Sequence, residues 1–122
     1  MKIPPSPTKK EIAESFSNGK FELIFPYLSE KIIWIVVGEN VFKGKDSVIA
    51  NCKQTAEYFN SVHTVFNTDE IIETNDRVVI RGTAEFKRDG RRDSFISACD
   101  VYEFNDKNEL EIISSYCIPD KK

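Results

Sequence analysis

Histidine, cysteine, surplus positive charge and long apolar runs are scarce in this sequence, and each is typical of a particular class of protein. Its 122 residues include one histidine and three cysteines, and acidic residues outnumber basic ones to give a net charge of −3. Without a surplus of positive charge, the chain lacks the broad cationic field that attracts nucleic acid or anionic lipid. No apolar run approaches the roughly 20 residues that a membrane-spanning helix needs. We therefore expect a soluble domain with neither nucleic acid nor membrane as its partner.

Cysteine and histidine are also too few, and too scattered, for a metal centre. Cys52, Cys99 and Cys117 are odd in number and widely spaced, which is typical of reduced thiols in a cytoplasmic protein. There is no CxxC pair and no HxxxH spacing, so we expect no metal site and no cofactor. The N-terminal MKIPPSPTKK has no apolar segment of the kind found in secretory signals. The expected location is the cytoplasm.

The length fits one domain, which we place at residues 8–119. Residues 1–7 contain three prolines and are expected to form a disordered lead-in, and residues 120–122 form a short tail. Thr8 followed by Glu11 has the spacing of a helix N-terminal capping box. Asn18-Gly19 is a typical signal for the end of that helix.

The next segments predict a short helix, a strand and a longer helix. Pro26 limits a second helical piece within KFELIFPYL, and Ile32–Val37 is rich in the β-branched residues that favour a strand. A helix then runs from Gly44 or Asp46 to about residue 59. Apolar residues recur along it at helical spacing and predict a buried stripe: Val48, Cys52, Ala56 and Phe59.

After the helix, the apolar pattern changes to the two-residue period of β-strands. Four segments alternate in this way, within residues 62–72, 77–86, 94–104 and 109–118, and polar turn sequences separate them. Helices followed by a long meander indicate an α+β domain with the helices packed on one face of a curved sheet. Because strands of about ten residues curl strongly, we expect the sheet and helices to enclose a conical cavity.

Three stretches resemble the nuclear transport factor 2-like superfamily, in particular its SnoaL-like and ketosteroid-isomerase-like domains: SNGKFELIFPYLSEKIIWIVV, VFKGKDSVI and CDVYEFNDKNELEIISSY. The resemblance extends from about Thr8 to Ile118. It implies a cystatin-like fold in which a cone-shaped, mixed or antiparallel curved sheet wraps around three N-terminal helices. It also implies a pocket at the wide end of the cone and a homodimer formed through the outer sheet face. Since such folds carry many functions, the resemblance indicates architecture more than activity.

The resemblance can be compared with steroid isomerases position by position. Those enzymes place a carboxylate base on the first strand, where this chain has Ile35 or Val36. Their tyrosine on the first helix is matched by the region of Ile12. The aspartic acid of their penultimate strand is matched by Asp100. One functional group of three is therefore retained, which disfavours isomerase chemistry of that kind.

Strand alternation assigns side chains to the two faces of the sheet. It places Ile96, Ala98, Asp100, Tyr102 and Phe104 on one face of the penultimate strand. On the last strand the corresponding set is Leu110, Ile112, Ser114 and Tyr116, and on the first strand it is Ile32, Trp34 and Val36. From these faces and the long helix, we predict the residues that line a pocket: Trp34, Val36, Tyr58, Ala98, Tyr102, Ser114 and Tyr116.

Asp100 and His63 are the candidate acid–base groups. Partial desolvation among aromatic neighbours raises the pKa of a carboxyl, although Asp100 could instead lie open to solvent or pair with Arg81. Histidine titrates near neutral pH, but Thr64 and Phe66 compete with His63 for the inward face. Asp100, His63 and a serine do not make a nucleophilic triad by themselves, because no GxSxG elbow accompanies them.

Two functions remain open. In the first, a dimeric cytoplasmic domain binds a small hydrophobic molecule in a mostly apolar pocket walled by Trp34, Tyr102 and Tyr116. In the second, Asp100, with or without His63, moves a proton in an isomerase, cyclase or dehydratase reaction.

Overall fold

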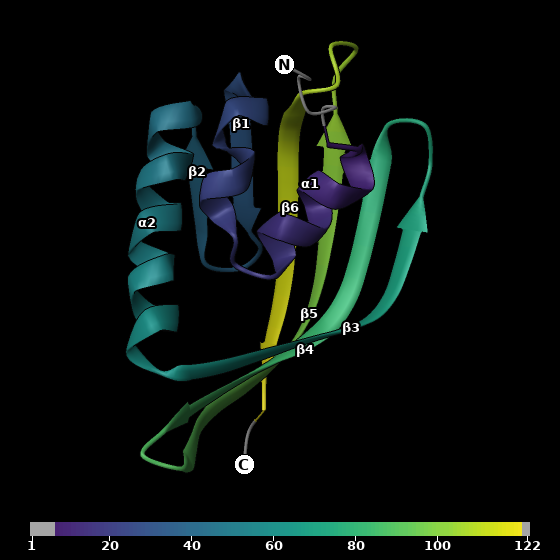
Figure 1. The fold of residues 1–122 in the computed structure, drawn as a ribbon. Coiled ribbons are helices and arrows are strands. Elements are labelled where there is room, and N and C mark those ends of the chain that lie inside the picture. The colour runs from purple at the N-terminus through teal and green to yellow at the C-terminus, as the bar shows by residue number, and fades with distance from the viewer. Residues whose placement is uncertain (1–6, 121–122) are drawn as a thin grey trace, which may run out of the picture.

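One six-stranded sheet and the helices on its concave face make up the fold (Figure 1). The computed structural model describes residues 7–120, so residues 1–6 of the expected lead-in and 121–122 of the expected tail lie outside the described residues. The elements, in chain order, are α1 (Lys9–Ser17), the 3₁₀ helix η1 (Phe21–Tyr27), β1 (Leu28–Val36), β2 (Asn40–Lys43), α2 (Lys45–Ser61), β3 (His63–Glu73), β4 (Arg77–Arg88), β5 (Arg91–Phe104) and β6 (Leu110–Pro119).

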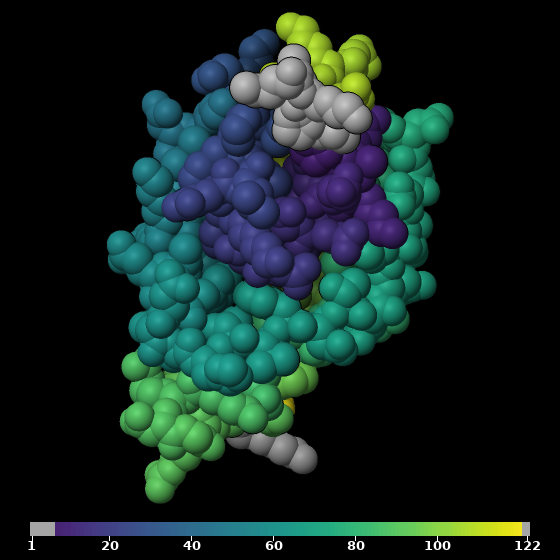
Figure 2. Space-filling view, in the orientation of Figure 1, coloured from purple at the N-terminus to yellow at the C-terminus, as the bar shows by residue number. Residues whose placement is uncertain are grey.

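The sheet is mixed, which is one of the two arrangements that the resemblance implied. Its strand order is β2-β1-β6-β5-β4-β3. The pair β1–β6 is parallel, and the other neighbouring pairs are antiparallel. The N-terminal helices and α2 lie on the same side of the sheet (Figure 1), and in the space-filling view they cover much of that face (Figure 2). The predicted α+β class and the curved sheet are therefore confirmed.

The arrangement of three N-terminal helices that the resemblance implied is not confirmed. Helix α2 follows β1 and β2, in line with the predicted order of a strand before the long helix, and the second helical piece is a 3₁₀ helix with Pro26 inside it. Strand β2 was not predicted. It is four residues long and mostly exposed, so it carries too few alternating apolar residues to produce a recognisable strand pattern.

The short-range signals in the sequence produce the local structures that they predict. Thr8 and Glu11 form a reciprocal capping box at the start of α1. The β4–β5 turn is made by Asp89 and Gly90, which both have positive φ angles, the geometry of a tight hairpin turn. Val48 and Cys52 are fully buried on the inner face of α2.

A bulge between Thr68 and Glu70 interrupts the pairing of β3 with β4. Gly82 lies opposite this irregularity, and a Cβ atom on Gly82 would lie 2.3 Å from the carbonyl oxygen of Asn67. The two backbones therefore approach more closely here than any side chain permits. Bulges of this kind bend and twist a sheet locally, so this point contributes to the curvature of the concave face.

A second irregularity, in the pairing of β5 with β6, changes which side chains of β6 point to the concave face. Phe104 pairs with Leu110 and Glu103 pairs with Ile112, so that Glu111 is an extra residue in the ladder. Beyond this bulge, Ile113 and Ser115 are buried. The alternation predicted for the last strand is therefore wrong after Leu110: Ile112, Ser114 and Tyr116 belong to the opposite face. One inserted residue has this effect because the side-chain period of a strand is two.

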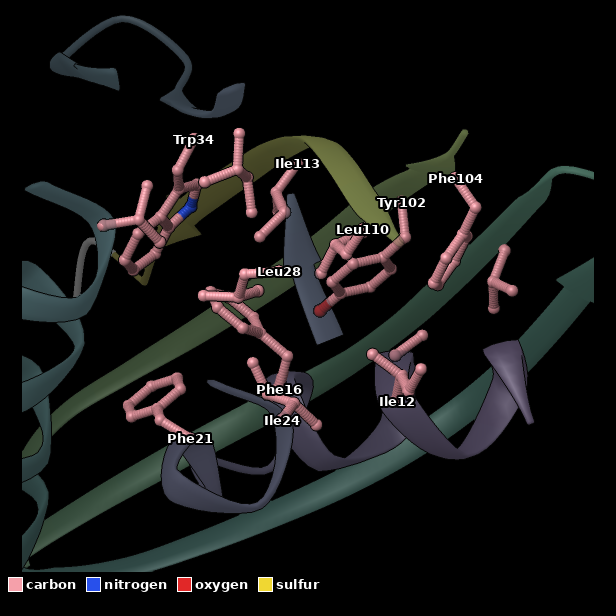
Figure 3. Close-up of a cluster of buried hydrophobic side chains, with 14 of the residues drawn as sticks. Ile12, Phe16, Phe21, Ile24, Leu28, Trp34, Tyr102, Phe104, Leu110 and Ile113 are labelled. Atoms are coloured by element: carbon pink, nitrogen blue, oxygen red, sulfur yellow. The ribbon is translucent and has the colours of Figure 1, made fainter. Parts of the chain in front are cut away.

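The core lies between α1, η1 and the part of the concave face that they cover, called here the packed end. Figure 3 shows these side chains converging from the helices and from the strands. Its fully buried members are large: Ile24, Leu28, Ile32, Tyr102, Leu110 and Ile113. The core continues along the concave face until the side chains of the sheet become small, and at that point it gives way to a cavity.

Candidate functional site: an aromatic cavity with one carboxyl

The rest of the concave face, called here the open end, holds a cavity of about 420 Å³ that opens to solvent. Buried Phe16, Trp34 and Ser115 belong to its floor, whereas Tyr58 and Asn67 are exposed and belong to its mouth. The expected cavity is therefore present, and its size suits a small organic molecule.

Small residues on two neighbouring strands leave room for this cavity. Gly82 and Ala84 on β4, and Ala98 on β5, all line it. Gly82 and Ala98 are direct partners in the β4–β5 ladder, so two minimal side chains lie next to each other at one place. Because neither residue has a side chain larger than a methyl group, the space above this pair stays open.

Two groups of aromatic rings enclose the cavity. The floor group centres on Phe16, whose ring centroid lies 5.0 Å from those of both Phe21 and Trp34. The outer group centres on Phe59, whose ring lies 5.5 Å from Phe86 and 5.2 Å from Phe66. Rings at these spacings pack favourably with each other and present both edges and faces to a ligand.

Asp100 is the polar centre of the floor. Its Oδ2 atom accepts a hydrogen bond of 3.0 Å from the Ser17 hydroxyl, which in turn contacts the hydroxyl of buried Tyr102. Figure 3 shows the Tyr102 hydroxyl directed from its strand toward α1. Burial raises the pKa of Asp100, and hydrogen bonds from Ser115, Ser17 and Tyr102 offset part of that rise.

A second donor chain reaches the same carboxyl from β1. The indole Nε1–H of Trp34 donates to the Ser115 hydroxyl at 3.0 Å, and Ser115 is hydrogen-bonded to Asp100, its partner in the β5–β6 ladder. Because the indole can only donate, the Ser115 oxygen must accept from it, which leaves the Ser115 hydrogen available for Asp100.

Among the described residues that line the cavity, Asp100 is the only aspartate, glutamate, lysine, arginine or histidine. Arg81, which the sequence offered as a partner for it, instead lies within 3.8 Å of Asp69 and 3.3 Å of Glu70. That alternative is therefore wrong. Arg81 pairs with Cys99 in the ladder, so alternation places it on the opposite face from Asp100.

The predicted pocket residues divide into three groups. Trp34, Val36, Tyr58, Ala98 and Asp100 line the cavity. Tyr102 is fully buried and does not line the cavity, but its hydroxyl contacts Ser17 and Asp100, which do. Ser114 and Tyr116 do not line it, because the β6 bulge turns them to the opposite face, where Tyr116 is 48% exposed.

His63 lies away from the cavity. It is exposed at the first position of β3, beside Lys87 of β4, while Phe66 occupies the inward face. His63 is therefore not among the residues that line the cavity with Asp100, and of the residues that competed for the inward face, Phe66 lines the cavity.

The sequence analysis did not select Ser17 or Ser115 as site residues. Ser17 is the last residue of α1, and a serine at the end of a helix gives no sign of a functional role in the sequence. Ser115 was missed because the bulge at Glu111 moves it to the inner face, whereas simple alternation from Leu110 places it on the outer face.

No group of three metal-ligating side chains occurs within residues 7–120, and no helix there is long and apolar enough to cross a membrane. Tyr58 at the mouth donates a hydrogen bond of 3.0 Å to Asp93.

Comparison with known proteins identifies the family. The model of the SnoaL-like domain matches residues 10–110. An NTF2-like protein of unknown function from Cytophaga hutchinsonii is 31% identical, with a TM-score of 0.81 over 89% of this chain and 95% of its own. No curated protein matches the sequence. The chain belongs to the SnoaL-like domain family.

More distant structures share the fold and carry the names of different enzymes. A candidate SnoaL-like polyketide cyclase from Shewanella denitrificans is 14% identical, with a TM-score of 0.69 over 93% of this chain and 92% of its own. An LEH-like epoxide hydrolase from M. tuberculosis is 15% identical, with a TM-score of 0.64 over 86% of this chain and 75% of its own. At these identities the likeness concerns the fold alone.

Proposed function

We propose that this SnoaL-like protein binds a small, mostly apolar molecule in the cavity and that Asp100 makes the main polar contact with it. The observation that carries this proposal is an open cavity of about 420 Å³, walled by aromatic rings, with one carboxyl on its floor. Binding sites for small molecules typically combine an apolar lining with a few polar groups that orient the ligand.

Proton transfer by Asp100 is the second candidate function, and it would make the protein an isomerase, cyclase or dehydratase. The raised pKa of Asp100 supports it, because a carboxyl that titrates closer to neutral pH is a better acid and base. Binding ranks first because the described lining offers no second charged acid–base group. Val36, which with Ile35 is one of the two residues matched to the steroid isomerase base, lines the cavity with an aliphatic side chain.

We also propose a homodimer formed through the outer sheet face. Tyr116 and Ile118 on β6 are 48% and 68% exposed, and Val65 and Ile72 on β3 are about half exposed. Apolar side chains repeated across one face of a sheet favour association. The three cysteines are free, which supports a reducing location such as the cytoplasm.

Trp34 offers a direct test of binding, because it is the only tryptophan and lies on the cavity floor. Titration with 4-phenylbutan-1-ol, a neutral aromatic alcohol, should change its fluorescence saturably. Ala98→Leu should weaken this binding by about tenfold or more, because the larger side chain occupies ligand space. Gln54→Leu, an exposed change on α2, is the control and should leave binding unchanged. Equal affinities in the two variants would contradict the assigned site.

The same cavity can be tested for proton transfer with 4-phenylbutan-2-one in D₂O. Exchange of the hydrogens next to its carbonyl, followed by NMR, measures abstraction and return of a proton without assuming a product. In the catalytic case, wild type accelerates exchange and Asp100→Asn does not. In the binding case, neither protein accelerates exchange, and the affinity of Asp100→Asn for the ketone stays close to that of wild type.

A further inference from the structure

The electrostatic state of the cavity indicates which kind of ligand it accepts, an inference that rests on the proposed binding function. Asp100 is partly buried and forms no ion pair among the described residues. The described lining contains no lysine, arginine or histidine. A negative charge in an apolar setting is unfavourable without a compensating positive charge. The charge of an ionised Asp100 is therefore not compensated by any described side chain of the cavity.

The hydrogen bonds around Asp100 favour its charged form. The Ser17 hydroxyl donates to Oδ2, and Ser115, fixed by the Trp34 N–H, has its own hydrogen available for the carboxyl. If Asp100 carried the proton and donated it to Ser115, that serine would accept twice and its own hydrogen would lose this partner. The donor arrangement is thus suited to a carboxylate, although burial opposes the charge.

A ligand cation would remove this conflict. An ammonium group beside Asp100 supplies the missing positive charge, and it is attracted to the faces of nearby aromatic rings. Phe16 and Trp34 line the floor around the carboxyl, and Phe59, Phe66 and Phe86 enclose the space toward the mouth. A carboxylate or phosphate ligand, in contrast, would meet a like charge and no described basic side chain.

We propose that the preferred ligand is a protonated amine with an apolar body, whose ammonium group binds Asp100 and whose body lies between the aromatic rings of the cavity. Trp34 and Ser115 act as positioning residues, because they hold the carboxyl as an acceptor directed at the ligand.

Three probes with the same phenylbutyl body test this proposal: 4-phenylbutylamine, 4-phenylbutan-1-ol and 4-phenylbutanoate. Calorimetric titration at pH 7.5 should rank the ammonium first and the carboxylate last. A hydrogen-bonded charge pair is worth more than a neutral hydrogen bond, so we expect the amine to bind about tenfold or more tightly than the alcohol.

Asp100→Asn removes the charge and keeps the shape of the side chain. We expect it to abolish the preference for the amine while binding of the alcohol changes less than about threefold. Asp106→Asn makes the same chemical change in an exposed turn and is the matched control, expected to behave as wild type. Because the alcohol reports an intact cavity, loss of amine binding alone cannot be attributed to misfolding.

The pH dependence gives an independent readout. The titratable groups near Asp100 are Tyr102 on its own strand, Cys117 on β6 and Cys99 on the opposite face; Ser17 of α1 and Ile80 of β4 do not titrate. Burial raises the pKa of Cys117 to about 11 and raises those of Tyr102 and Cys99 as well. Affinity for the amine should therefore increase as pH rises from 4 through the pKa of Asp100, and affinity for the alcohol should not increase.

The outcomes separate this inference from the function on which it rests. If the alcohol binds as tightly as the amine, or if Asp100→Asn keeps the preference for the amine, the inference is wrong and the binding function stands. If none of the three probes binds at millimolar concentration, both are wrong.

Discussion

The two ends of the concave sheet face share the same alternation of inward and outward residues but differ in side-chain size. At the packed end, Tyr102 and Phe104 of β5 and Leu110 of β6 fill the space beneath α1 and are buried. At the open end, Ala98 of β5 lies next to Gly82 of β4, and both line the cavity. Alternation therefore determines which side chains face inward, and their volumes determine whether that face becomes core or pocket.

The polar network lies where these two regions meet. Asp100 lies between Tyr102 and Ala98 along the inner face of β5, and Ser17 and Ser115 approach it from α1 and β6. The packed end thus holds the hydroxyl groups in place, and the open end gives the carboxyl access to a ligand. Three variants test how separate these regions are.

The largest expected effect belongs to the packed end. Ile113→Ala should reduce the free energy of unfolding by about 2–5 kcal/mol, because the residue is fully buried and its removal leaves a void. Urea denaturation measures the change. The control, Leu23→Ala, alters a side chain that is 63% exposed and should cost less than about 1 kcal/mol. Similar losses in the two variants would show that the assigned core is wrong.

A smaller effect is expected from Gly82→Ala at the bend that shapes the open end. The new methyl group would meet the Asn67 carbonyl oxygen at 2.3 Å, so β3 and β4 must separate locally. Overpacking of this kind costs about 1–3 kcal/mol, and we expect a matching loss in urea denaturation together with weaker binding of 4-phenylbutan-1-ol. Gly82 is informative because, unlike the other four glycines, it has no positive φ angle. Unchanged stability would mean that the close approach is not required.

The smallest effect is expected at the boundary between the regions. Burial raises the folded-state pKa of Asp100 above its ordinary value of 3.8, so the folded protein binds this proton more tightly than the unfolded chain. Stability supplied by the group is therefore complete below pH 3.8 and is lost as pH rises through the raised pKa. Denaturation across pH 4–8 should show Asp100→Asn gaining stability relative to wild type as pH rises. A constant difference would contradict the raised pKa.

Much of the site could be predicted from residues that lie close together in sequence. Alternation along residues 94–104 correctly placed Ala98 and Asp100 on the inner face, and the helical period correctly placed Cys52 in the core. The same rule was wrong for Ser114 and Tyr116, because Glu111 is an extra residue at the pairing of β5 with β6. A bulge is a property of two paired strands, so the alternation of one strand does not reveal it.

The helix cap at Thr8, the turn at Asp89-Gly90 and the inner face of β5 follow from local sequence, because each depends on residues within a few positions of one another. The contact of Gly82 with Ala98, and the convergence of donors from positions 17 and 115 on Asp100, arise from the folded arrangement of the chain. Those contacts depend on strand register and sheet curvature, which bring together residues that are far apart along the chain.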